Sequence, residues 1–258
     1  MLNTYTSYQL ITKDIEKSLD RVEKQPLVER DTAYYLENIV KVKSAEEFLA
    51  DDRLFRYAMK AHGLEDMTYA KAFIAKAIKE GIDNEDSFAN KLSDRRYYNF
   101  VETFNFERYG DTTTVFGRTQ QGTVDKYVRQ TLEEDAGKQN EGVRLALYFD
   151  RNASKITNFY QVLADPALAQ VVRTSLGLPD SFATADVDKQ VKLYEEKLDI
   201  EDFQDPEALD KFLTRFTSLW EVANPTQSPQ AQVSILFGQP AEYGISTSLL
   251  LTMQGLKF

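Results

Sequence analysis

Few residues in this chain of 258 could perform nucleophilic, acid–base or metal chemistry. His62 is the only histidine and cysteine is absent, which excludes zinc sites built on those two ligands and any cysteine nucleophile. A serine–histidine–aspartate triad would have to use His62. That residue directly precedes Gly63, where we expect a helix to end, and a position favoured by the helix dipole explains it better than a role as a catalytic base.

The acidic residues are more numerous, but their local patterns match no metal-binding loop. Clusters at residues 83–86 and 199–202 lack the glycine at the sixth position and the spaced glutamate of a calcium-binding EF-hand loop. The chain also has no glycine-rich phosphate loop and no Gly-x-Ser-x-Gly elbow. We therefore expect no metal, no cofactor and no enzymatic activity. A hydrolase with paired carboxylates is the last alternative, and it would need two acids to converge in a cleft.

The balance of charge argues against nucleic acid as a partner. The 31 lysines and arginines are outnumbered by 41 aspartates and glutamates, a net charge of -10, so counterion release from DNA or RNA would favour binding little. No run approaches the roughly 18 consecutive apolar residues of a membrane span. Residues 1–20 have no basic start followed by an apolar core, so no cleaved secretory signal is expected. We expect a soluble protein made in the cytoplasm, with export by a route that needs no cleaved signal as an open alternative.

The elements that would position any functional residue are mostly helices. Glycine contributes only 11 residues and proline 7, and both occur at the ends of apolar-periodic segments. Apolar residues recur every three or four positions in residues 2–22 and again in 245–256, which predicts an amphipathic helix near each end of the sequence. We therefore predict a mostly α fold.

An internal repeat organises the middle of the chain. A shift of 114 residues superimposes Leu-Ala-Asp at 49–51 on the same tripeptide at 163–165, and Gly-Leu at 63–64 on 177–178. The same shift pairs Arg30 with Arg144, Tyr34 with Tyr148, Asn38 with Asn152, Lys41 with Lys155 and Leu54 with Leu168. We interpret the pattern as a tandem duplication of one helical domain, with copies at residues 26–106 and 140–222.

Four aspartates precede apolar helices in these copies, namely Asp51, Asp94, Asp165 and Asp205. An aspartate at this place accepts hydrogen bonds from the backbone N–H groups of the first helical turn. Proline follows the last two at the first helical position, where it is well tolerated. We predict that the four are helix caps and do not form a carboxylate cluster.

Two segments outside the copies are rich in β-forming residues. Residues 109–117 and 232–238 each end in Phe-Gly and could pair as a short two-stranded ribbon that rests on helices. The predicted organisation is an N-terminal helix (1–25), the first copy, a connector with a strand and a helix (107–139), the second copy, and a last segment with a linker, a strand and a C-terminal helix (223–258).

The chain resembles a known family through structural motifs. They are Tyr-x-x-x-Asn, Leu-Ala-Asp and Gly-Leu in the duplicated unit, Ser-Phe-Ala-Asn-Lys-Leu-Ser-Asp at 87–94, and Leu-Leu-Leu-Thr-Met-Gln at 249–254. With these motifs the sequence is similar to an alphaproteobacterial family of unknown function whose members are often encoded among flagellar genes. The resemblance covers most of the chain, brings no catalytic residues and implies a flagellum-linked context.

The apolar stripes near the two ends supply a candidate interface in that context. Flagellar axial proteins are exported without a cleaved signal, generally lack cysteine and carry apolar-striped terminal helices. The candidate interface residues are Tyr5, Tyr8, Ile11, Ile15, Leu249, Leu250 and Met253. We hypothesise a non-enzymatic flagellum-associated structural or assembly protein whose partners are flagellar components or further copies of itself. The alternatives are a cytoplasmic adaptor or export chaperone with a groove for a partner helix, and terminal helices that pack within one molecule.

Overall fold

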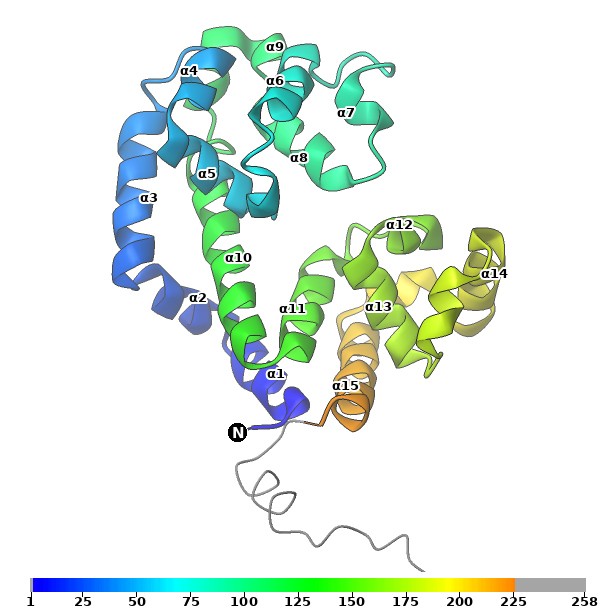
Figure 1. The fold of residues 1–258 in the computed structure, drawn as a ribbon. Coiled ribbons are helices and arrows are strands. Elements are labelled where there is room, and N and C mark those ends of the chain that lie inside the picture. Colours follow the sequence, from blue (N-terminus) through cyan, green and yellow to red (C-terminus); the bar gives the residue numbers. More distant parts are fainter. Residues whose placement is uncertain (1, 226–258) are drawn as a thin grey trace, which may run out of the picture.

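A computed structural model of the chain describes residues 2–225, which form two helical lobes on either side of a central elbow (Figure 1). These residues contain α-helices and short 3-10 helices and no strand, which confirms the mostly α fold class. Within the same range, no helix is both long enough and apolar enough to cross a membrane.

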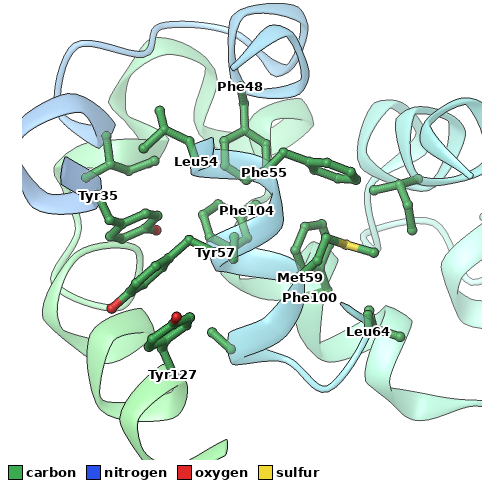
Figure 2. Close-up of a cluster of buried hydrophobic side chains, with 14 of the residues drawn as sticks. Tyr35, Phe48, Leu54, Phe55, Tyr57, Met59, Leu64, Phe100, Phe104 and Tyr127 are labelled. Atoms are coloured by element: carbon green, nitrogen blue, oxygen red, sulfur yellow. The ribbon is translucent and has the colours of Figure 1, made fainter. Parts of the chain in front are cut away.

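The first lobe lies on one side of the elbow and has its own core. Its helices are α2 (Ile15–Glu23), α3 (Pro26–Ile39), α4 (Ala45–Ala50), α5 (Asp52–Ala61), α6 (Lys71–Glu80), α7 (Phe88–Lys91), α8 (Arg95–Thr103) and α9 (Phe106–Tyr109), with 3-10 helices η1 (Glu65–Met67) and η2 (Gly110–Val115). Aromatic rings fill the core, and Figure 2 shows a row of three tyrosines at its edge. Tyr57 stacks on Tyr35 at 4.4 Å and on Tyr127 at 3.8 Å between ring centroids. Because Tyr127 belongs to the central helix α10 (Gln121–Gln139), these stacked rings fix the lobe to the elbow.

The second lobe packs around a separate core. It contains α11 (Glu141–Ala153), α12 (Phe159–Ala164), α13 (Pro166–Ser175), α14 (Val187–Lys197) and α15 (Pro206–Ala223), with 3-10 helices η3 (Asp180–Thr184) and η4 (Ile200–Phe203). Phe149, Phe203 and Phe216 are fully buried there. Each lobe therefore buries an apolar cluster of its own, the main favourable term in folding.

The elbow bends at a single residue, between α10 and α11. Asn140 ends α10 and caps α11, because its side chain accepts hydrogen bonds from the N–H groups of Gly142 (2.9 Å) and Val143 (3.3 Å). Its Nδ2 also donates to Thr4 Oγ1 at 2.9 Å, and the Thr4 N–H donates to Glu221 at 2.8 Å. The start of α1 (Thr4–Thr12), the elbow and the end of α15 therefore meet at one vertex (Figure 1).

The N-terminal stripe forms two helices where the sequence predicted one. Asp14 interrupts the stripe, since its side chain accepts from the Lys17 N–H at 3.1 Å and so starts α2. The break lets α1 pack on the second lobe, where Tyr8 joins the core, and α2 on the first lobe, where Val22 does. Ile11 contacts both cores.

The predicted strand at residues 109–117 is wrong. This segment forms the end of α9 and the 3-10 helix η2. Its threonines satisfy backbone carbonyls with their hydroxyls: Thr113 Oγ1 donates to Gly110 O at 2.8 Å, and Thr114 Oγ1 donates to Val42 O at 2.9 Å. The first of these bonds is local and the second reaches a carbonyl 72 residues earlier in the chain. Such side-chain bonds compete with a strand, which would need a partner to pair with. Its proposed partner, 232–238, lies outside the described residues.

Candidate functional site

The four predicted capping aspartates all lie at the start of a helix. Asp51 accepts from the N–H groups of Arg53 and Leu54, and Asp165 accepts from those of Ala167 and Leu168, at 2.9–3.2 Å. Asp94 accepts from the Arg96 N–H at 2.9 Å and Asp205 from the Ala208 N–H at 2.8 Å. Each carboxylate thus serves its own helix, an arrangement that counts against a hydrolase built on these four. Within residues 2–225, no group of three or more acids and histidines is arranged to hold a metal ion.

Equivalent contacts recur in both lobes at the 114-residue spacing. The Tyr34 hydroxyl donates to Asp51 at 2.7 Å, and the Tyr148 hydroxyl donates to Asp165 at 2.6 Å. Asn38 donates to the Tyr34 carbonyl at 2.8 Å, and Asn152 donates to the Tyr148 carbonyl at 2.9 Å. These pairs are the result expected if one unit is used twice; the duplication itself stays a prediction.

The candidate interface residues fall into three groups. Tyr8 is only 3% exposed and packs in the second core, so the expectation that it faces a partner is corrected: the apolar side of α1 is used within the molecule. Ile11 and Ile15 are partly buried against the cores. Tyr5 is 40% exposed and stays on the surface. Leu249, Leu250 and Met253 lie outside the described residues.

A groove that sequence patterns did not reveal lies beside α1. It has a volume of about 540 Å³ and is lined by α1, α11, η4 and α15. Phe203 and Leu209 supply apolar surface, while Asp150 and Asp210 carry negative charge. Burial, and then these two carboxylates, raise the pKa of the Tyr8 hydroxyl, which therefore stays protonated. Because the lining comes from segments about 200 residues apart, no spacing in the sequence marks it.

A buried ion network connects α10 to α11. The Glu133 side chain is only 2% exposed, and it accepts from Arg129 Nε at 3.2 Å and from Arg151 Nη2 at 2.9 Å. Arg129 also donates to the Leu147 carbonyl at 3.1 Å and to Asp150 at 3.3 Å. The network therefore holds the two arms of the elbow at a fixed separation.

A second group of charges, which we call the basic cluster, comprises His62, Lys126, Arg151 and Lys155. Lys126 Nζ lies 3.5 Å from His62 Nε2 and donates to Thr103 Oγ1 at 3.2 Å. Burial, helped by Lys155 and Arg151, lowers the pKa of Lys126 to about 8. Burial and the positive charges of Lys126, Arg151 and Lys155 hold the pKa of His62 well below its usual value. The single histidine, interpreted from the sequence as a simple helix end, does cap α5, but it also lies among cations contributed by two other helical segments.

The neutral state of His62 predicts acid sensitivity. In the unfolded chain His62 protonates near pH 6.5, whereas in the folded protein its pKa is depressed, so below about pH 6.5 the unfolded state binds more protons. The free energy of unfolding should therefore fall as the pH drops below that value, with a slope of up to about 1.4 kcal/mol per pH unit.

Urea denaturation between about pH 5.5 and 7.5 measures this effect. The substitution His62→Gln removes the only histidine and should flatten the dependence. Equal slopes for the wild type and the variant would show that other groups cause it.

Comparisons with known proteins identify one family and one similar crystal structure. A family described as "Protein of unknown function (DUF1217)" matches residues 61–209, a range that runs from the end of α5 into α15 and so includes parts of both lobes. An X-ray crystal structure of a protein from Agrobacterium tumefaciens is similar, with a TM-score of 0.81 and 53% sequence identity over 86% of this chain and 94% of that chain. A search of curated proteins gave no match.

Proposed function

We propose that this chain, which belongs to the DUF1217 family of proteins of unknown function, is a non-enzymatic structural or assembly protein of the bacterial flagellum that acts through helix–helix contacts. Membership of an uncharacterised family confirms the resemblance found in its motifs. The flagellar setting comes from that resemblance, and the mode of action is inferred from the surface of the first helix.

Exposed apolar residues just before α1, along it and near the end of α15 support helix contacts. Leu2, Tyr5 and Leu10 are 55%, 40% and 59% exposed, although the other side of α1 is packed in the molecule. Val222, which is 81% exposed, follows the residue that binds Thr4 and so lies near the start of α1. We call these four residues the vertex patch. A short helix with apolar side chains on both sides is suited to contact a further helix.

Deletion of the gene in the native host tests the flagellar role. We expect reduced swimming in soft agar and a protein that co-purifies with filament–hook–basal bodies. Full motility, with the protein absent from purified basal bodies, would refute the proposal.

Complementation with surface variants tests the mode of action. The double substitution Tyr5→Glu and Leu10→Glu should fail to restore motility, because each charge would have to be desolvated at the contact. Val187→Glu is the matched control, since Val187 is 51% exposed but lies in α14, in the second lobe away from the vertex (Figure 1). Thermal unfolding checks that all variants are folded. Truncation of α1 and α2 is less informative, because Tyr8 and Val22 belong to the cores.

The groove beside α1 favours a second candidate, an adaptor or export chaperone. Its apolar surface, with Asp150 and Asp210 as charged groups, could hold a segment of a client protein. The substitution Asp210→Arg would then abolish function, while the vertex variants would keep it. The opposite result favours the structural or assembly role.

A further inference from the structure

We propose that the basic cluster is a binding site for a phosphate group, free or esterified, at the junction of the two arms of the elbow. His62 ends α5, Lys126 lies on α10, and Arg151 and Lys155 lie at the end of α11 and just after it. The site would therefore take ligands from the first lobe, the central helix and the second lobe. This inference is independent of the proposed helix contacts.

The first argument is that two members of the cluster, Lys126 and Lys155, lack charge compensation, whereas Arg151 is paired with Glu133 at 2.9 Å. Within the described part of the chain, neither Lys126 nor Lys155 has a carboxylate within ion-pair distance, whereas Lys60, which is partly buried like Lys126, pairs with Glu134 at 2.8 Å. Glu102 acts to raise the pKa of Lys126, but its effect is outweighed by that of Lys155. Acidic residues outnumber basic ones in this chain, which has a net charge of -10. Because Lys126 and Lys155 nevertheless lack a carboxylate partner among the described residues, their charge indicates an anion supplied from outside the chain.

The second argument is that hydrogen-bond donors accompany the charges. Arg151 uses Nη2 to bind Glu133 and Gln130, while its Nε is buried and has no partner among the described residues. Among the described residues, the hydrogen-bond partners of Lys126 are uncharged groups, the His62 ring and the Thr103 hydroxyl. An oxyanion would accept from such donors, and its negative charge would raise the pKa of Lys126, which burial and then the neighbouring cations now lower.

Helix ends alone do not explain the cluster. The carbonyl end of α11 attracts the positive charges of Arg151 and Lys155, and the same effect favours a basic residue at position 62. Lys126, however, lies inside α10, more than a turn from either end. Arg151 donates to Gln130, which lies about one turn from Lys126 on α10, and Lys155 follows Arg151 by four residues, so these cations lie on neighbouring turns. Such a group matches a doubly charged phosphate better than a single carboxylate, which would leave part of the charge unpaired.

Calorimetric titration with inorganic phosphate, at constant ionic strength and pH 7, tests the proposal on the full chain. We expect saturable binding to the wild type and at least about a tenfold weaker affinity for the double variant Lys126→Gln, Lys155→Gln. Lys24→Gln and Lys41→Gln are matched controls, because both lysines are exposed and lie outside the cluster. A parallel titration with methyl phosphate separates the sources: binding of both indicates a site open to phosphate esters, and binding of inorganic phosphate alone indicates a site for the free ion.

The single histidine gives a direct readout of the same site. Its imidazole nitrogen signals in a ¹⁵N-labelled sample need no assignment, because the sequence contains only one histidine. Saturating phosphate should raise the pKa of His62 in the wild type, and should leave it unchanged in the double lysine variant. The absence of saturable binding, or equal binding by the double variant, would overturn the proposal. An equal response to chloride at matched ionic strength would also overturn it, since that is simple screening.

Discussion

Replacing Glu133 with alanine is expected to lower the free energy of unfolding by about 3–5 kcal/mol. The substitution leaves Arg129 and Arg151 facing each other without their shared carboxylate, and their side chains are only 14% and 23% exposed. Removing one member of a buried ion network lowers the free energy of unfolding by far more than the network as a whole contributes to it, because the remaining charges stay desolvated without a partner. Urea denaturation at pH 7.5, where His62 does not titrate, measures the change.

The exposed pair of Lys41 and Glu37 provides the control. Both side chains are more than half exposed, at 61% and 74%, so Glu37→Ala should cost no more than about 0.5 kcal/mol. The variant Glu133→Gln keeps a hydrogen-bond acceptor and should fall between the two. If Glu133→Ala destabilised the protein no more than Glu37→Ala, the network would not hold the elbow.

Gly142→Ala is expected to cost about 3 kcal/mol, at the upper end of the usual range for overpacking. Gly142 lies in the first turn of α11, and a Cβ there would come within 2.3 Å of Trp220 Cδ1 and 2.5 Å of its Nε1. The indole is 9% exposed and held between helices, so it cannot turn aside freely. The gain in helix propensity, about 1 kcal/mol, is too small to offset this clash.

Gly137→Ala is the matched control in the neighbouring helix. Its Cβ would meet Arg144 Cδ at 2.8 Å, an atom of a partly exposed side chain that can turn aside, and Arg144 Cβ at 3.2 Å, a tight contact that a shift of a few tenths of an ångström relieves. We expect a change in stability much smaller than that of Gly142→Ala. Combining Gly142→Ala with Trp220→Leu should recover part of the loss relative to the sum of the single changes, because the smaller side chain makes room. Equal thermal stability of the two glycine variants would contradict the close approach of α11 and α15.

The helix boundaries are the features that the local sequence predicted best. Asp51 and Asp165 start helices, and Gly63 and Gly177 follow the same helices with φ of 68° and 66°, the left-handed conformation that favours glycine. These features depend on interactions within a few residues, so their sequence signals are strong. The strand predicted at residues 109–117 failed because β propensity reflects packing against neighbours, and this segment instead bonds to nearby carbonyls.

The N-terminal apolar stripe shows what periodicity alone cannot predict. Its apolar period predicted a helix correctly, but the period could not say what the apolar side would contact. Only the packed structure shows Tyr8 in the second core and Tyr5 on the surface, with a break at Asp14 between two helices. The sequence does not distinguish a stripe that serves a partner from one that serves the molecule's own core.

The sequence by itself determined a mostly helical, cysteine-free and acidic chain with capped helices, and its motifs indicated the family. These properties follow from composition, periodicity and contacts between near neighbours. The tertiary structure alone decided that Glu133 would lie between two arginines, and that His62 would lie among Lys126, Arg151 and Lys155. The physical reason is that electrostatic interaction and desolvation depend on distance in space, and the groups concerned come from helices up to about 90 residues apart in the sequence.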